Sequence, residues 1–416
     1  MPGSALERLT AAARTAWLFG LPLIEIATTR RRLTGVGAPM NSFVHPPNLA
    51  DHRARAVTTP NNDTLYASAQ VDLAGGPVTI TLPPSGERYV SLALMDAYTN
   101  NFAILGTRTT GQDGLTFTLV GPCEAADGPH VVRSPTRHVW ALGRILVDGP
   151  HDLAAARAVQ TGVSMQGPAA APYPATATRG SSWADYFASV ARLMADNPPP
   201  LTDRAALQTM APLGLTAFDP ARLSPSQVEA IEAGVAEARG LLRGGGLEAT
   251  GFADGWSYPA ARLGDFGEDY LYRAGVALGG LGALPPAEAM YMRAKGDLPR
   301  ALFDGATDWR LHFAADGRIP VDAFWSLSLY EATDDGQFFF ADNPLDRYAI
   351  GDRTPGLQAN ADGSLDIWIG HADPGPERRG NWLPAPQGPF ALFLRAYLPR
   401  RELLDGAYRL PAVTRA

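Results

Sequence analysis

The chain has 416 residues, of which 46% are hydrophobic and 19% charged, so it is long enough for two or three domains with a large buried core. Its net charge of −7 argues against nucleic-acid binding, because no Lys/Arg cluster, including the densest run at 30–32, could form a phosphate-binding stripe. Its single cysteine, Cys123, excludes an intrachain disulfide and a thiolate metal site.

The first predicted element is an N-terminal helix. Leu6, Leu9, Ala13 and Trp17 recur at helical spacing, and Pro22 is expected to interrupt the helix soon afterwards. No stretch approaches the roughly 20 apolar residues needed to cross a bilayer, and the N-terminus lacks the basic and apolar segments of a secretory leader. We therefore expect a cytoplasmic protein without a membrane partner.

The segment from about residue 61 to residue 147 changes to the alternating pattern of β-strands. The predicted strands are Val78–Leu82, Tyr89–Met95, Leu115–Val120 and His138–Val147. Several short strands at this spacing favour a sandwich or a barrel over a parallel sheet.

The middle third of the chain is predicted to be helical. Apolar stripes run from Trp183 to Met194 and from Tyr270 to Leu281. Between them, residues 224–227 form a capping box with proline at the first helical position. This start predicts a helix as far as about residue 242, stopped by the glycines at 244–246.

After Pro299 the strands return, at Arg310–Ala314, Ala323–Ala332, Leu365–Gly370 and Phe390–Pro399. We therefore divide the chain into an N-terminal helix with a first β domain at 1–160, a helical connecting segment at 161–300 and a second β domain at 301–416.

Two short runs, at 59–66 and 381–386, combine backbone-bending residues with side chains that can form hydrogen bonds. Asn and Asp bond to their own backbone in turns, and Pro fixes the direction of the chain. Such runs hold polar groups rigidly on loops, where binding and catalytic residues usually sit. The side chains of interest are Asn61, Asn62 and Asp63 in the first run, and Asn381 and Trp382 in the second.

Three strand positions are further candidates. Arg395 and Tyr397 share one face of a strand, where the arginine can clamp a carboxylate or stack on a ring, or form an inter-sheet salt bridge. In residues 324–330 a Ser/Tyr face opposes a Trp/Leu face, so Tyr330 is more available to a cavity than Trp325.

Asp96 begins a polar run at the end of a strand, and it is either an acceptor that caps a turn or a site group. Nucleotide-binding glycine loops, serine-hydrolase elbows and paired histidine metal motifs are not found in the sequence. We therefore expect no organic cofactor and no bound metal, and an acid–base site of carboxylate, Tyr, Arg and amide groups remains. A metal-dependent enzyme, with a hard metal held by Asp63, Asp96 and backbone carbonyls, is an alternative that ranks below the two hypotheses given at the end of this section.

The segment from about residue 18 to residue 160 resembles the family called domain of unknown function 1254, through residues 59–66, 96–99 and 139–144. From about 302 to 411 the chain resembles domain of unknown function 1214, through residues 324–330, 381–384 and 395–399. The resemblance implies an α+β fold with two antiparallel β-barrel or jelly-roll-like domains joined by helices, and self-assembly into a homo-oligomer.

Two hypotheses follow. The first is an enzyme that performs acid–base hydrolysis or elimination on a small polar organic molecule in a pocket between the β domains. The second is a non-catalytic jelly-roll assembly or small-ligand-binding protein, in which the two runs merely lock loops. In the first hypothesis the catalytic candidates are Asp63, Asp96, Tyr66 and Tyr330, and the substrate-binding candidates are Asn61, Asn62, Asn381, Trp382, Arg395 and Tyr397.

Overall fold

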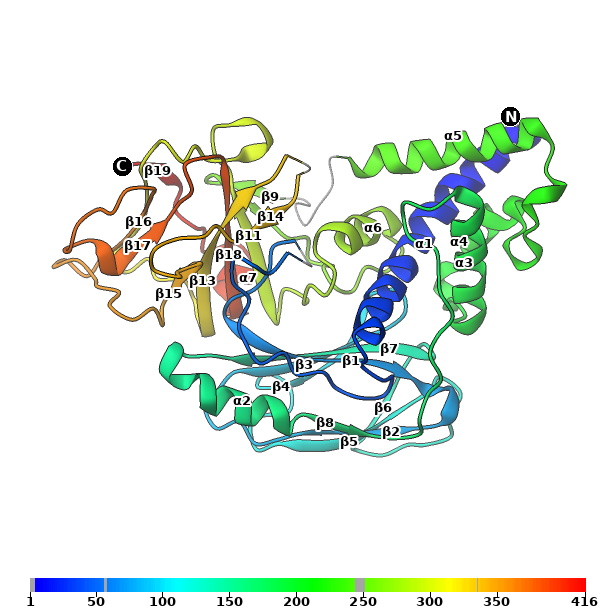
Figure 1. Ribbon diagram of the computed structural model, residues 1–416, viewed down its shortest axis with the longest axis horizontal. Helices are drawn as coiled ribbons and strands as arrows, with labels where there is room; N and C mark the ends of the chain where they lie inside the picture. Colours follow the sequence, from blue (N-terminus) through cyan, green and yellow to red (C-terminus); the bar gives the residue numbers. More distant parts are fainter. Residues whose placement is uncertain (1–3, 56–57, 244–250, 335) are drawn as a thin grey trace.

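The computed structural model describes residues 4–55, 58–243, 251–334 and 336–416. Figure 1 shows a first β domain at the bottom of the view, a second β domain at the upper left and a helical part at the upper right. The predicted α+β class is confirmed by this arrangement.

The helical part is built around α1 (Ala5–Gly35), which begins with a capping box between Ser4 and Glu7. The helices that contact α1 are α3 (Trp183–Asp196), α4 (Arg204–Met210), α5 (Pro225–Leu242) and α6 (Tyr270–Gly279). The predicted bounds of α5 are confirmed, and the glycines expected to stop it lie outside the described residues.

The predicted interruption at Pro22 is wrong, because α1 continues through it. Proline removes one backbone hydrogen bond from a helix. The side chains from Ala16 to Ile24 are all buried, so packing against the other helices compensates for that loss.

The prediction that no segment is long and apolar enough to cross a membrane is wrong for α1. Within the described ranges, α1 is the one helix that is long and apolar enough by length and composition. However, 78% of its most apolar window is buried inside the structure, as expected of a central core helix.

The first β domain consists of two four-stranded sheets, sheet A with strand order β1-β7-β3-β4 and sheet B with order β6-β5-β2-β8. Leu65 and Ala67 of sheet A pack against Ile80 and Phe117 of sheet B. The alternate residues of sheet A, including Tyr66, point away from sheet B. The strands are β1 (Thr64–Asp72), β2 (Val78–Leu82), β3 (Val90–Met95), β4 (Asn101–Gly106), β5 (Leu115–Val120), β6 (Val131–Arg133), β7 (His138–Leu146) and β8 (Ser164–Gln166). Helix α2 (Leu153–Gly162) lies beside β1 and β7.

The second β domain pairs a larger sheet C, with order β14-β13-β18-β11-β10-β9 and β15 beside β13, with sheet D, of order β17-β16-β12-β19. Trp325 and Leu392 of sheet C pack against Leu311 and Ile367 of sheet D. The strands are β9 (Gly251–Ala253), β10 (Trp256–Tyr258), β11 (Ala289–Ala294), β12 (Trp309–Phe313), β13 (Val321–Ala332), β14 (Phe338–Phe339), β15 (Ala349–Gly351), β16 (Leu365–Gly370), β17 (Trp382–Pro384), β18 (Phe390–Pro399) and β19 (Val413–Arg415). A short helix, α7 (Arg401–Leu404), follows β18.

In the residues that the structure describes, none of the four sheets closes into a barrel. The barrel or jelly-roll description is therefore not confirmed. The connecting segment, predicted to be helical, also contributes strands: β8 pairs with β2, and β9, β10 and β11 belong to sheet C.

The outward faces of sheets A and C meet between the two β domains. Tyr89 and Ala93 of the first domain share a buried cluster with Phe324 and Tyr397 of the second. The ring centroid of Tyr397 lies 4.1 Å from that of Phe324 and 5.4 Å from that of Tyr89. This contact places the side chains of two sheets opposite one another, and most of the predicted site residues lie there.

Candidate functional site

Two rows of polar side chains face each other across the domain interface. In sheet A the strand register places Arg144 between Tyr66 and Ser91. In sheet C it places Arg395 between Tyr291 and Ser326. We call this region the interdomain site; its members are Asn61, Asp63, Tyr66 and Arg144 from the first domain and Tyr291, Ser326, Tyr330, Arg395 and Tyr397 from the second.

The run at 59–66 joins these rows. The Asn61 amide nitrogen donates to the Tyr397 hydroxyl at 2.6 Å, and the Asn61 amide oxygen accepts from the backbone N–H of Asp63 at 2.6 Å. Thr59 has φ of 50°, a left-handed conformation that β-branched residues rarely adopt. Its carbonyl accepts from Arg395 at 3.0 Å. The run therefore forms the local turn predicted for it and also binds the second β domain.

Asp63 lies between the domains, not on an exposed loop. Its side chain accepts a 2.6 Å hydrogen bond from the Ser326 hydroxyl, and its other carboxylate oxygen lies 3.7 Å from a guanidinium nitrogen of Arg353. Asp63 is only 7% exposed. Its carboxylate is thus held by one hydroxyl and one cation, both from the second domain.

Arg395 is 5% exposed and donates to the Ser328 hydroxyl at 2.8 Å. The inter-sheet salt bridge that was one possibility for Arg395 is not observed, because no described carboxylate oxygen lies within 4 Å of its guanidinium. Burial opposes its charge, whereas Tyr330, Tyr397 and Asp63 raise the pKa of Arg395 above its ordinary value.

Tyr330 and Tyr397, the two fully buried tyrosines of the interdomain site, are neutral hydrogen-bonding groups. The Tyr330 hydroxyl donates to the carbonyl oxygen of Pro60 at 2.6 Å, and burial raises the pKa of Tyr330. Burial, reinforced by Tyr291 and Asp63, raises the pKa of Tyr397 well above its ordinary value. Neither phenol is therefore ionised near neutral pH, and neither serves as a base.

Arg144 is the residue that reasoning from the sequence missed. It is 5% exposed, one of its terminal nitrogens donates to the carbonyl of Gly282 at 2.6 Å, and the other is buried without a hydrogen-bond partner among the described residues. Its guanidinium carbon lies 5.6 Å from the centroid of the Tyr66 ring. The available signal was an arginine at an outward position of an otherwise apolar strand, beside Trp140 and Leu142.

The interface carries more guanidinium than carboxylate charge. Its two buried carboxylates are already paired, Asp63 with Arg353 and Glu288 with Arg108. Arg144 and Arg395 have no such partner within 4 Å in the described part of the chain.

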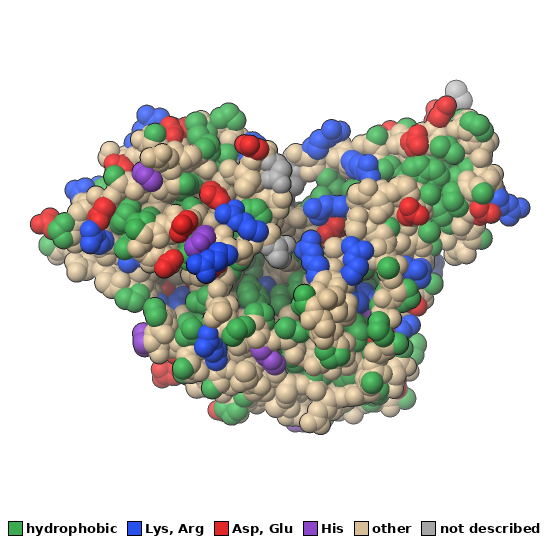
Figure 2. Space-filling view, viewed as in Figure 1, with side chains coloured by type: hydrophobic (Ala, Val, Ile, Leu, Met, Phe, Trp, Pro, Cys, Tyr) green, Lys and Arg blue, Asp and Glu red, His purple; other side chains and the backbone are tan. Residues whose placement is uncertain are grey.

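Tyr66 and Tyr291 are the half-buried members of the interdomain site. Figure 2 shows a recess in the molecular surface where the two β domains and the helical part meet.

Other predicted site residues lie apart from this cluster. Asn62 donates to the carbonyl of Ala50 at 2.5 Å. Asp96 caps its own turn by accepting from the backbone N–H groups of Tyr98 and Asn100. Burial raises the pKa of Asp96 to about 6. Of its two predicted alternatives, the structure favours the turn-capping acceptor.

Asn381 and Trp382 are not brought to the interdomain site. Asn381 exchanges hydrogen bonds with the backbone of Gln358 and donates to the carbonyl of Asp366. The Trp382 indole donates to the carbonyl of Gly370 at 2.9 Å. Both residues thus lock the β16–β17 edge of sheet D, and the expectation that they contact a substrate beside Asp63 has no support in the geometry.

Among the described residues, one group of three has the spacing to hold a metal ion. The ligand atoms of His52, Asp342 and Asp346 lie within 4.8 Å of one another. The Tyr348 hydroxyl already bonds to both His52 and Asp346, and both carboxylates are exposed. Neither Asp63 nor Asp96 belongs to this group.

The comparison with known solved structures supports the fold. The structure of the VPA0106 protein from Vibrio parahaemolyticus is 24% identical, with a TM-score of 0.72, and the match covers 98% of this chain and 100% of that one. An uncharacterized protein from Burkholderia cenocepacia is 12% identical, with a TM-score of 0.47, and the match covers 99% of this chain and 95% of that one. No curated protein matches the chain.

Family models match both β domains. The model described as protein of unknown function DUF1254 matches residues 40–167, which include sheets A and B, and DUF1214, also described as a protein of unknown function, matches residues 288–401, which include most of sheets C and D. The residues of the interdomain site are divided between these two matched regions. The chain therefore belongs to the proteins that carry DUF1254 and DUF1214 regions in tandem.

Proposed function

We propose that this protein is an enzyme that binds a small organic carboxylate in the interdomain site and acts on it by acid–base hydrolysis or elimination. The observation that carries this proposal is the guanidinium of Arg144, which is 5% exposed and has one terminal nitrogen without a hydrogen-bond partner in the described residues.

A buried charge without a partner is unfavourable, and a buried donor left unsatisfied costs roughly 1–3 kcal/mol. A carboxylate offers two oxygens that match the planar fork of a guanidinium. Arg144 and Arg395 can accept such a ligand without displacing an acidic side chain, because the buried carboxylates of the interface already have other partners.

Asp63 is the group that we assign to proton transfer. Its carboxylate has room for more hydrogen bonds than the one from Ser326. Arg353 and Ser326 fix its orientation, which a general base requires. Tyr66, which is half-buried beside Arg144, is the proposed proton donor. Tyr330 is less suited to that role because its hydroxyl proton is directed to Pro60.

A second candidate, a non-catalytic ligand-binding or assembly protein, is favoured by a different observation. Asn61, Asp63 and Arg395 all form hydrogen bonds from one β domain to the other. These contacts would hold the domains together in the absence of any chemistry. Under either proposal we also propose a jelly-roll architecture, a cytoplasmic location and a homo-oligomeric state.

The test is a panel of small carboxylates that can undergo the proposed reactions, screened by the thermal midpoint of the protein. Malate, citrate and 3-hydroxybutyrate can lose water by elimination, and N-acetylglycine and hippurate carry an amide bond that can be hydrolysed. Any acid that raises the midpoint is then incubated with the protein, and its conversion is followed by proton NMR. We expect at least one acid to bind and to be converted, and Asp63→Asn to retain binding while losing conversion. Binding without conversion in the natural protein would favour the second candidate, and conversion unchanged in Asp63→Asn would refute the role of Asp63.

A further inference from the structure

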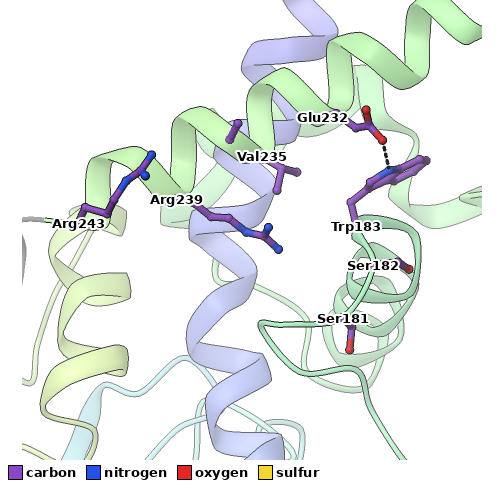
Figure 3. A pocket seen from close by; sticks show the side chains of 8 residues that line it. Ser181, Ser182, Trp183, Glu232, Val235, Arg239 and Arg243 are labelled. Carbon is purple, nitrogen blue, oxygen red and sulfur yellow. Dashed lines mark hydrogen bonds between the residues drawn. The ribbon is translucent and has the colours of Figure 1, made fainter. Parts of the chain in front are cut away.

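A separate cavity of about 530 Å³ lies in the helical part, between α5 and the start of α3. Figure 3 shows Arg239 pointing into this space, with the contact between Trp183 and Glu232 at one end and Arg243 at the other. We call this cavity the helical groove; the lining residues that matter here are Ser181, Trp183, Glu232, Val235, Arg239 and Arg243.

The helical groove has a cationic side. Arg239 lies in the last turn of α5, and Arg243, four residues later, is its C-cap residue with helical backbone angles, so both side chains line the same groove. Neither of them pairs with a carboxylate among the described residues; Arg239 instead donates to the carbonyl of Arg179 at 3.3 Å and lies 5.7 Å from the ring centroid of Trp17. Two like charges at this spacing repel each other unless an anion lies between them.

The rest of the groove combines an aromatic and aliphatic surface with two serines and one glutamate. The Trp183 indole donates to the Glu232 carboxylate at 3.3 Å, which holds both side chains in place. Val235 adds an aliphatic surface. With two arginines and one glutamate, the lining carries one net positive charge, although the whole chain carries −7.

A neighbouring cavity of about 370 Å³ extends this surface. It shares Arg239 and Arg243 with the helical groove and adds Trp17, Leu242 and Leu278. A ligand could therefore place an anionic group at the shared arginines while its apolar body lies on an indole or on the aliphatic side chains. The volume of the helical groove falls within the usual range for small-molecule sites.

We propose that the helical groove binds a small organic anion with a flat apolar body, its acidic group held by Arg239 and Arg243. This site is distinct from the interdomain site and does not rest on the function proposed for it. The competing explanation is that the two arginines only complement the dipole at the C-terminal end of α5.

The test uses 1-naphthoate as the anionic probe and 1-naphthamide as its uncharged counterpart, both titrated into the full chain by isothermal calorimetry. We expect naphthoate to bind with one-to-one stoichiometry and naphthamide to bind at least about tenfold more weakly. The double variant Arg239→Gln/Arg243→Gln should lose naphthoate affinity by a similar factor. The pair Arg239→Lys/Arg243→Lys should retain part of it, because the charge remains.

The matched control is Arg204→Gln/Arg222→Gln, which removes two exposed arginines of the helical part that line neither cavity. This control should bind naphthoate like the natural protein. The inference is overturned if naphthoate does not bind at about 1 mM, if the glutamine pair binds it unchanged, or if the control pair loses as much affinity. It is also overturned if Arg144→Gln, and not the groove pair, abolishes binding. Should the glutamine pair fail to fold, titration of naphthoate into Arg144→Gln decides: unchanged binding supports the groove, and lost binding overturns the inference.

Discussion

The runs at 59–66 and 381–386 both combine Asn with Pro, but they have different roles. The Asn61 amide donates to Tyr397, which is 336 residues away in the chain, whereas the Asn381 amide donates to backbone carbonyls 23 and 15 residues away. Both runs form rigid, hydrogen-bonded loops, as their composition predicts. Composition does not predict what a rigid loop contacts: the first run forms hydrogen bonds with the opposite β domain, whereas the second bonds within its own.

The difference follows from the sheet that each run enters. The first run leads into β1 of sheet A, whose outward face meets sheet C. The second contains β17, which pairs with β16 at the edge of sheet D. The first run therefore joins the two β domains, whereas the second run only fixes the backbone of its own sheet.

The largest predicted effect is a loss of stability when Asn381, which bonds to the backbone at the β16–β17 edge of sheet D, is replaced. Asn381→Ala removes the three part-buried hydrogen bonds that the Asn381 side chain forms with the backbone of Gln358 and Asp366. We expect the free energy of unfolding to fall by about 2–4 kcal/mol, with ligand binding per folded molecule unchanged. Urea denaturation measures this loss. Asn62→Ala, which removes one bond to Ala50, is the control and should cost about 1 kcal/mol; equal losses would contradict the account.

The next effect depends on pH and concerns Asp96, another residue that locks its own turn. Burial raises the pKa of Asp96 to about 6 in the folded protein, so the folded state holds this proton more tightly than the unfolded state. The stabilisation is complete below about pH 4 and is lost as the pH rises through about 6, a change of about 1–3 kcal/mol.

The free energy of unfolding, measured between these pH values in the natural protein and in Asp96→Asn, checks this prediction. The variant has no proton to release at this position, so its stability should fall less steeply with rising pH. Parallel pH profiles for the two proteins would show that Asp96 ionises normally.

A smaller effect is expected at the domain contact. Asp63→Asn still accepts the hydrogen bond from Ser326 but loses its charge interaction with Arg353, so we expect a stability loss of about 1 kcal/mol. A double-mutant cycle of Asp63→Ala with Ser326→Ala should give a coupling energy of about 1 kcal/mol. Additive effects in the cycle would indicate that the contact across the domains contributes nothing.

Much of the fold could be predicted from the sequence. Alternating patterns between proline and glycine breaks predicted the bounds of β2, β5, β16 and β18, and the capping box predicted α5. Pro22 was misread because a local rule for helix breaking ignores burial, and here the packing of α1 outweighs one lost hydrogen bond.

The interdomain site was only partly predictable. Alternation along β18 identifies the face that Arg395 and Tyr397 share, but it cannot say which sheet lies opposite. Arg144 was missed for the same reason: its significance appears only when sheet C covers it and leaves one nitrogen without a partner among the described residues. Strand periodicity is local information, whereas the contact between two sheets depends on the whole fold.

In the function that we propose, Arg144 anchors a small organic carboxylate between the β domains. The most direct test is calorimetric titration of the carboxylate that gives the largest thermal shift into the natural protein, into Arg144→Gln and into Arg310→Gln, which removes a charge on sheet D. The account predicts that affinity falls at least about tenfold in Arg144→Gln and is unchanged in Arg310→Gln. Equal affinity in all three proteins would contradict it.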